Sequence, residues 1–117
     1  MTTFSYSCAE LAPGIVHLKL VGPLDWQACA RLDAELNALF DRGVNRLAIE
    51  LRQAGFATSA AFGLLIYAHD VTTKRKGALV IVAPPPSIAD TLKMLGLNQI
   101  FAFCDTVEDA KRILSQV

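Results

Sequence analysis

Short apolar runs with the two-residue period of a β-strand alternate along this chain with longer runs that have the period of an α-helix. Residues 78–83 (ALVIVA) form an almost unbroken apolar run, which is typical of a central strand covered on both faces. Residues 46–51 alternate instead, with Leu47, Ile49 and Leu51 on one side. Strands separated by helices favour a mostly parallel sheet covered by helices. The pattern therefore predicts an α/β fold.

Turn and capping residues divide the chain into five predicted strands and four predicted helices. Pro13-Gly14 predicts a hairpin between the first two strands, which makes the sheet mixed rather than wholly parallel. Asp25 follows the second strand and is expected to cap the next helix, because its carboxylate can accept free backbone N–H groups. We expect a single domain over residues 1–117, without a linker or repeat. The predicted strands are residues 4–8, 15–21, 46–51, 78–83 and 100–103, and the predicted helices are roughly residues 26–42, 61–76, 87–95 and 107–114.

Three weaker signals concern a loop and two helix starts. Residues 53–60 contain mostly small side chains and are predicted to form a loop. The segments 87–90 and 106–109 each have the spacing of a capping box, so Ser87 and Thr106 are expected to cap helices.

Composition excludes several classes of function. Eleven basic residues balance eleven acidic ones, so the chain has no overall basic field to hold nucleic acid. The chain has an odd number of cysteines, and they are widely spaced: Cys8, Cys29 and Cys104. This pattern favours free thiols in a reducing compartment. With no signal peptide and no membrane span in the sequence, we expect a cytoplasmic protein. Hydrophobic residues make up 53% of the chain and charged residues 19%, which suggests contact with a partner or with a second copy of itself.

The sequence contains no motif of a known catalytic or cofactor site. The histidines, His17 and His69, have no second histidine or carboxylate at metal-binding spacing. Glycines occur singly, so no phosphate-binding loop is present, and the carboxylates are expected on helix surfaces. We therefore expect no catalytic residue, no metal and no cofactor, and we interpret the chain as a protein-binding domain rather than an enzyme.

Thr58 and Ser59 occupy a junction where small residues lead into the second predicted helix. One interpretation is capping, because a hydroxyl at this point can accept the free N–H groups of the first turn. The other is a regulatory phosphate acceptor, because an anion is favoured at a helix N-terminus. A phosphate there would add about −1.5 to −2 charges to a surface of low charge and so repel a partner.

The junction and its surroundings resemble the STAS domain family of bacterial anti-sigma-factor antagonists and sulfate-transporter tails. Residues 22–25 (GPLD) are similar to the family's G-x-[LI]-D, and residues 47–51 (LAIEL) to its central strand. Residues 56–63 (FATSAAFG) resemble F-[IVM]-D-S-[ST]-G-[LI]-G, and residues 95–101 (LGLNQIF) resemble L-x-G-L-D-x-[VI]-F. The four motifs occur in the family's order and cover nearly the whole chain.

The resemblance implies a five-stranded mixed sheet with about four helices packed mainly on one side. It also implies that Ser59 is phosphorylated by a partner serine kinase, which is itself the anti-sigma factor. Dephosphorylated antagonist would bind that kinase, and phosphorylation would release it. This chain departs from the motif, because Thr58 replaces the aspartate, Ala60 replaces a serine or threonine, and Ala61 replaces a glycine.

Two alternatives stand beside a phosphorylated antagonist. A STAS accessory or scaffold subunit, in a lipid-transport ATPase or a stress-signalling complex, would not need Ser59. A nucleotide-binding module or an enzyme ranks last, because no phosphate loop is present. The expected contact face is the second helix with the loop before it, and the predicted partner-binding residues are Asp25, Thr58, Ser59, Phe62 and Tyr67. Core packing is the competing interpretation for Phe62.

Overall fold

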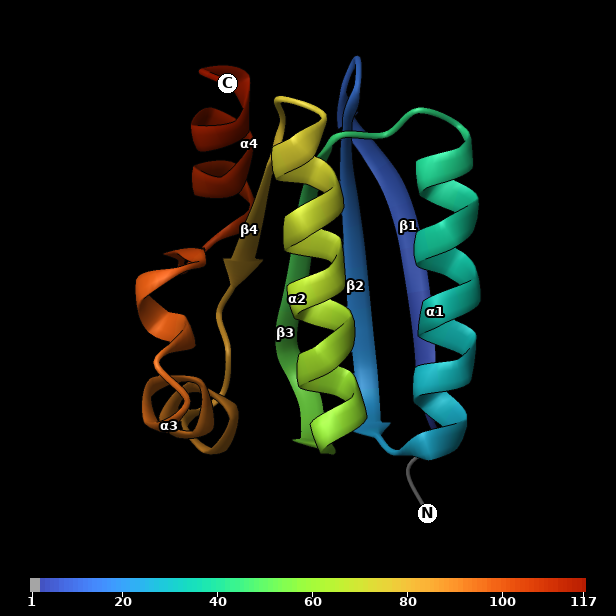
Figure 1. Ribbon diagram of the computed structural model, residues 1–117, viewed down its shortest axis with the longest axis vertical. Coiled ribbons are helices and arrows are strands. Elements are labelled where there is room, and N and C mark those ends of the chain that lie inside the picture. Colours follow the sequence, from blue (N-terminus) through green and yellow to red (C-terminus); the bar gives the residue numbers. More distant parts are fainter. Residues whose placement is uncertain (1–2) are drawn as a thin grey trace.

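Residues 3–117 are described by a computed structural model, and this part of the chain folds into five strands and four α-helices (Figure 1). The predicted α/β fold with a five-stranded mixed sheet is confirmed. The strands are β1 (Ser5–Ala12), β2 (Ile15–Leu24), β3 (Arg46–Ala57), β4 (Ala78–Val82) and β5 (Ala102–Cys104), and the helices are α1 (Trp26–Asp41), α2 (Ser59–Lys74), α3 (Pro86–Met94) and α4 (Val107–Ser115). A short 3-10 turn, Leu97–Gln99, precedes β5.

The strands lie in the order β1-β2-β3-β4-β5 across the sheet. β1 and β2 form an antiparallel hairpin, and each later strand is parallel to the one before it. Gly14 has a φ of 80° in the hairpin turn, a left-handed conformation that glycine adopts without steric cost. The turn predicted at Pro13-Gly14 is therefore confirmed, and it is the reason the sheet is mixed.

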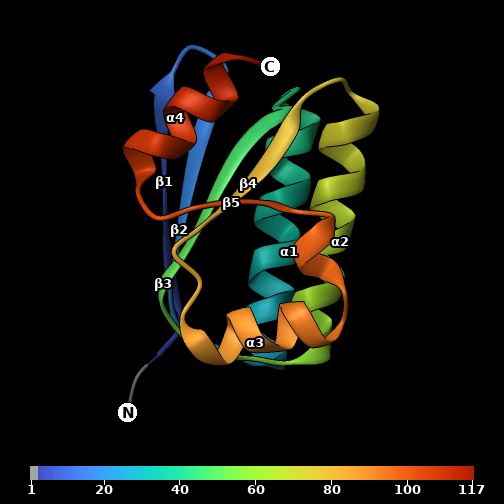
Figure 2. The same cartoon turned by 90° about the vertical axis from the view of Figure 1, so that its left-hand side faces the viewer.

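The helices cover the two faces of the sheet unequally, as Figure 2 shows. α1, α2 and α3 enclose the main core on one face, where Leu18, Leu20 and Ile49 are fully buried. α4 lies on the opposite face over a smaller core. Each central strand contributes to both cores, because successive side chains of a strand point to opposite faces. The smaller core consists of Ile15, Ala48, Val80, Val82, Ala110 and Leu114.

β3 is longer than its sequence pattern predicts. It continues through Ala57, so the prediction of a loop over residues 53–60 is wrong for most of that segment. The extension is held by pairing to β2, which includes Gly22 with Ala54 and Leu24 with Ala57. Register shifts interrupt this pairing on both sides of Gly22, so the regular alternation of apolar residues is lost.

Two other predictions of local structure need correction. α3 begins at Pro86 with Pro85 at the cap position and without a side-chain cap, so the prediction for Ser87 is wrong. Proline suits the first turn because it has no N–H group to satisfy there. β5 begins two residues later than predicted, after the 3-10 turn. The capping prediction for Thr106 is confirmed, because its Oγ1 accepts the Asp109 N–H at 3.1 Å.

Candidate functional site

β2 and β3 end side by side, and the helices that follow them begin at the same end of the molecule (Figure 1). Leu24 is the last residue of β2 and pairs with Ala57, the last residue of β3. Asp25 and Thr58 then occupy the cap positions of α1 and α2. We call Leu24, Asp25, Thr58 and Ser59 the paired helix starts. Parallel strands therefore bring together residues that are more than thirty positions apart in the sequence.

Asp25 begins α1 as the sequence predicts. Its backbone is extended, and its Oδ1 accepts the N–H of Ala28 at 2.9 Å. This bond satisfies one of the N–H groups that the first turn of a helix leaves free. The carboxylate of Asp25 is therefore engaged within its own helix.

Thr58 begins α2 in a different way. Its backbone N–H and its side-chain hydroxyl both donate to the carbonyl oxygen of Leu24, at 3.2 and 3.1 Å. The side chain makes no capping bond to α2, so the predicted capping by a hydroxyl is wrong for Thr58. The thiol of Cys29 lies beneath this contact, 3.7 Å from Thr58 Oγ1. Thr58 thus tethers the start of α2 to the end of β2.

Ser59 is the first residue of α2, and its side chain is exposed. The first turn of α2 contains no acidic residue and no side-chain cap. The positive end of the helix dipole is therefore not neutralised by the helix's own side chains. A negative group attached to Ser59 would lie at this favourable position.

A groove of about 460 Å³ opens beside Ser59, between α2 and the end of α3. Ile66 and Leu95 form parts of its walls and are 41% and 57% exposed. Gly63 adds no side chain to the wall formed by α2. The space above it is open, because a Cβ at this position would have no neighbouring atom within 4 Å. The groove is lined by Ala57, Ser59, Phe62, Gly63, Ile66, Thr91 and Leu95. Its surface is therefore mainly apolar, with hydroxyl groups from Ser59 and Thr91.

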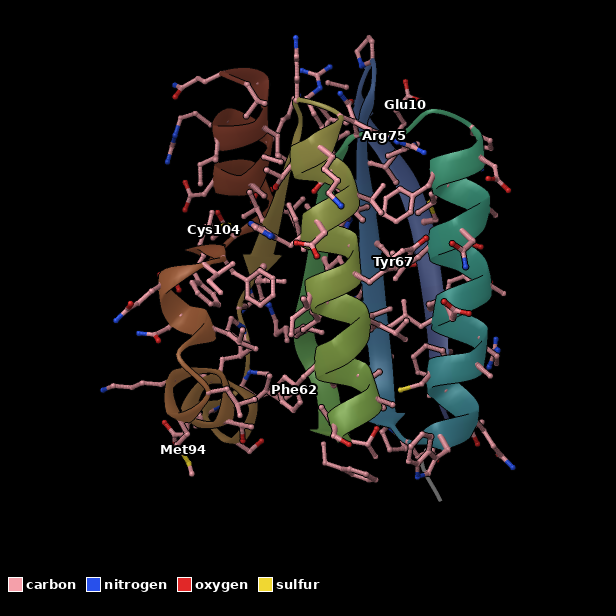
Figure 3. The ribbon with its side chains drawn as sticks, viewed as in Figure 1. Glu10, Phe62, Tyr67, Arg75, Met94 and Cys104 are labelled. Carbon is pink, nitrogen blue, oxygen red and sulfur yellow. The ribbon has the colours of Figure 1, made fainter. Side chains whose placement is uncertain are left out.

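Further exposed apolar side chains lie near this end of the molecule. Phe56, near the end of β3, is 53% exposed, and Trp26, the first residue of α1, is 71% exposed. Met94 ends α3 next to the groove residue Leu95 and points into solvent (Figure 3). Large apolar side chains that stay exposed near one groove are typical of a protein-binding surface. Met94 and Leu95 could not be predicted as exposed, because exposed and buried apolar residues look alike in a sequence.

The two aromatic residues predicted to bind a partner lie on different sides of α2 (Figure 3). Phe62 faces α3 and is only 6% exposed, so its ring packs in the main core while its edge lines the groove. Tyr67 lies on the α1 side, where its hydroxyl donates to Asn37 Oδ1 at 2.6 Å. Its ring also packs edge-on against Phe40. The structure thus brings Asp25, Thr58 and Ser59 together, places Phe62 beside them, and separates Tyr67 from the groove.

The opposite face of the sheet holds an ion pair that sequence spacing did not predict. His17 Nε2 lies 2.9 Å from Glu50 Oε1, and Arg52 Nε lies 3.6 Å from the other carboxylate oxygen. Glu50 is a strand residue and is only 7% exposed, so the prediction that the carboxylates lie on helix surfaces is wrong for it. His17 lies on β2 and Glu50 on the neighbouring strand β3, and nothing in the sequence relates positions 17 and 50.

Two features are absent from the described residues, 3–117. No group of three or more histidine, cysteine, aspartate or glutamate side chains has the arrangement of a metal site in this part of the chain. Within the same residues, no helix has the length and apolar character needed to span a membrane.

Solved structures of anti-sigma factor antagonists share this fold over nearly their whole length. One from Mycobacterium paratuberculosis superposes with a TM-score of 0.86 at 18% identity, over 97% of this chain and 95% of that one. The antagonist SpoIIAA in its unphosphorylated form gives 0.76 at 17% identity, over 96% of this chain and 98% of that one. The Bacillus cell fate determinant SpoIIAA in its phosphorylated form gives 0.77 at 17% identity, over 93% and 99%. At identities this low, the superpositions establish a common fold and nothing further.

Family membership follows from the sequence match. A sequence model of the STAS domain matches residues 6–110, a segment that includes the paired helix starts and the groove between α2 and α3. The match covers nearly the whole chain, and the fold agrees with it. The chain therefore belongs to the STAS domain family.

Proposed function

We propose that this chain is a regulatory protein-binding module that acts as an anti-sigma-factor antagonist, not as an enzyme. In this proposal its partner is an anti-sigma factor with serine kinase activity, and the complex forms in the cytoplasm. The observation that carries the proposal is the position of Ser59, whose exposed hydroxyl borders the apolar groove at the uncapped start of α2. Asp25 and Thr58 hold the two helix starts that frame this surface.

Phosphorylation of Ser59 would act as the switch. Phosphate adds about −1.5 to −2 charges at neutral pH. The free N–H groups of α2 stabilise this charge within the free chain. In a complex, the same charge would have to be desolvated beside Phe62, Ile66 and Leu95, which line the groove and offer it no counter-charge. The physical result is release of a partner that covers the groove.

The departures from the family motif are compatible with this switch. Ala61 replaces a glycine, but its N–H donates to the Thr58 carbonyl at 3.0 Å in an ordinary first helical turn. It is not among the residues with a positive φ, so alanine causes no backbone strain at this position. Thr58 replaces an aspartate and uses its hydroxyl to fix the helix start to Leu24. The acceptor Ser59 therefore keeps a defined position without the carboxylate.

The similar structures are consistent with this proposal. They include anti-sigma factor antagonists, and SpoIIAA among them has both an unphosphorylated and a phosphorylated form. A serine at a helix start beside a partner-binding groove would give this chain the same two forms.

A constitutive accessory or scaffold subunit is the second candidate function, either in a lipid-transport ATPase or in a stress-signalling complex. The observation in its favour is that Thr58 and Ala60 stand where the motif has an aspartate and a second hydroxyl residue, so a kinase would find fewer polar groups beside Ser59. In that case the groove would bind its partner whether or not Ser59 carried a charge.

The test is a kinase assay with the serine-kinase anti-sigma factor encoded nearest to the gene of this chain. The chain is incubated with that kinase and Mg-ATP, and the tryptic peptide 53–74 is sequenced by mass spectrometry. We expect one phosphoryl group on Ser59, with none on Thr58. An unmodified Ser59 under conditions where the kinase hydrolyses ATP would contradict the phosphorylation switch.

Binding of two variants separates the two candidate functions. For an antagonist, Ser59→Ala should bind the kinase like the unmodified chain, whereas Ser59→Asp should bind at least about tenfold more weakly. Thr73→Asp is a matched control, because it adds the same charge to an exposed position at the other end of α2. Equal binding by Ser59→Ala and Ser59→Asp would favour the scaffold.

A further inference from the structure

β4 and β5 are neighbouring parallel strands, and the helices that follow them leave to opposite faces of the sheet. α3 follows β4 and packs against the main core, whereas α4 follows β5 and covers the smaller core (Figure 2). The carboxyl ends of the two strands lie side by side, because Val82 pairs with Cys104. Helices that diverge in this way leave a crevice beyond the strand ends, which is where open α/β sheets commonly bind ligands.

A cavity of about 460 Å³ occupies this crevice, and we call it the β4–β5 cavity. Its walls come from the chain after β4, from α3 and from β5 with the residues that follow it. Ala83, Pro84 and Phe103 supply apolar surface, and Cys104 places its thiol in the wall between α3 and α4 (Figure 3). The volume lies within the range of about 300–1,000 Å³ that is usual for small-molecule sites.

Two features hold the walls of the β4–β5 cavity in place. Ala83 has a φ of 51°, a left-handed conformation that is unfavourable for a residue with a Cβ. Its N–H donates to the carbonyl oxygen of Cys104 at 2.9 Å, so β5 holds this turn. Arg52, which pairs with Glu50, also donates from Nη2 to the carbonyl oxygen of Asp105. Strained backbone that is maintained by surrounding contacts is found preferentially at ligand sites.

Three charged side chains border the cavity. Asp90 and Lys93 lie one turn apart on α3, and Asp105 follows β5. In the part of the chain that the structure describes, none of the three forms an ion pair with another side chain. A ligand with a single charge would be attracted by one kind of group and repelled by the other. A ligand that carries both an ammonium and a carboxylate group complements all three.

We propose that the β4–β5 cavity binds a small zwitterion with an apolar body, of the class of free α-amino acids with an apolar side chain. The carboxylate of the ligand contacts Lys93, and its ammonium group contacts Asp90 or Asp105. Its apolar body lies against Pro84 and Phe103. A nucleotide fits this lining poorly, because its phosphates would meet two carboxylates and a single lysine.

The β4–β5 cavity is separate from the proposed partner site. Asp90 and Lys93 of α3 border the cavity, whereas Thr91 and Leu95 border the groove beside Ser59. With about 3.6 residues per turn, these two pairs lie on opposite sides of the helix. Binding of the zwitterion and phosphorylation of Ser59 can therefore be measured independently, and the failure of one leaves the other standing.

Protection of Cys104 from alkylation tests the proposal. Iodoacetamide reacts with thiolates, and Cys8 on β1 is the internal control because it does not line the cavity. Burial raises the pKa of both thiols, so the reaction is run at about pH 8.5 and followed by mass spectrometry of the two peptides. At about 5 mM L-phenylalanine or L-leucine, we expect the rate at Cys104 to fall at least about fivefold, with the rate at Cys8 unchanged. No protection by either amino acid would overturn the proposal.

Analogues of the ligand test the need for both charges. Phenethylamine lacks the carboxylate of L-phenylalanine, and 3-phenylpropionate lacks the ammonium group. Each should protect Cys104 at least about threefold less than L-phenylalanine at the same concentration, and ATP should give no protection. Equal protection by an analogue with one charge would show binding of the apolar body alone and would overturn the zwitterion. Stronger protection by ATP would overturn it in favour of a nucleotide.

Two variants test the residues that carry the charges. Lys93→Gln and Asp105→Asn each remove one charge and should reduce the protection by L-phenylalanine at least about threefold. Lys111→Gln is the matched control, because it removes the same charge from an exposed position on α4 that does not line the cavity. Protection is the ratio of the rates with and without ligand within each variant, so a change in the reactivity of Cys104 itself cancels. Equal effects of Lys93→Gln and Lys111→Gln would overturn the assignment of Lys93.

Discussion

The starts of α1 and α2 occupy equivalent places in the fold but are built differently. Each follows a parallel strand, and the two strands end paired at Leu24 and Ala57. Asp25 uses its side chain to satisfy an N–H group of its own helix, whereas Thr58 uses its side chain to hold the end of β2, the strand beside its own. The comparison shows that α1 begins with a side-chain cap, whereas α2 begins without one. Under the proposed function, a phosphorylated Ser59 or a partner would occupy this helix start.

The largest effect is expected where the side-chain cap exists. Asp25→Ala removes the bond to the Ala28 N–H, so the free energy of unfolding should fall by about 1 kcal/mol and the unfolding temperature by roughly 4 °C. Thermal unfolding at one fixed protein concentration measures this loss. Asp25→Asn is the control, because asparagine caps as well as aspartate, and its stability should stay near that of the natural chain. An equal loss in both variants would mean that the carboxylate acts by charge and not by capping.

A smaller loss is expected for the tether at α2. Thr58→Val keeps the shape of the side chain but removes the hydroxyl that donates to the Leu24 carbonyl. That carbonyl still accepts the Thr58 backbone N–H, so the free energy of unfolding should fall by only about 0.5 kcal/mol. Urea unfolding checks the value, and Thr58→Ser, which retains the hydroxyl, should lose less. A loss above that of Asp25→Ala would reverse the order of the two helix starts.

Giving α2 the kind of cap that α1 has should leave stability almost unchanged. Thr58→Asp can accept an N–H of the first turn and gain roughly 1 kcal/mol, but it gives up the hydroxyl that donates to Leu24. The net change in the free energy of unfolding should lie within about 0.5 kcal/mol of zero. Thermal unfolding of Thr58→Asp beside Thr58→Val separates the two contributions. Equal stability of these variants would show that an aspartate cannot cap α2.

The smallest effect is expected at the candidate acceptor itself. Ser59→Ala removes an exposed hydroxyl at the first position of α2, so the free energy of unfolding should change by less than about 0.5 kcal/mol. Hydrogen exchange of the α2 amides should also be unchanged. A loss of 1 kcal/mol or more would give Ser59 a structural role in the start of α2 and weaken its assignment as a switch residue.

The sequence predicted those parts of this arrangement that depend on local spacing. Asp25 was identifiable as a cap because it follows a strand and precedes a regular helical pattern. The tether from Thr58 to Leu24 was not, because it joins residues thirty-four positions apart through the pairing of two strands. The contact of His17 with Glu50 could not be predicted for the same reason, because it also depends on the pairing of two strands. The end of β3 was missed because its small residues and register shifts hide the strand period.

The exposure of apolar side chains beside the groove could not be predicted from the sequence, for another reason. Leu92 and Leu95 are the same amino acid and lie close together in the sequence, yet Leu92 is fully buried and Leu95 is 57% exposed. Only the packing of α3 against the rest of the chain distinguishes them. The order of the motifs predicted the family and singled out Ser59 as a candidate phosphate acceptor. The groove beside Ser59 could be found only in the structure.

The smaller core under α4 has a consequence for synthesis of the protein on the ribosome. β1 to β4 end well before α4 in the sequence, so most of the sheet is synthesised before α4. During that interval Ile15, Val80 and Val82 lie on a face with nothing to cover them. The nascent chain is then a candidate for chaperone binding, and the arrival of Ala110 and Leu114 ends that period. Packing of α4 is therefore the step that removes this apolar face from contact with other proteins.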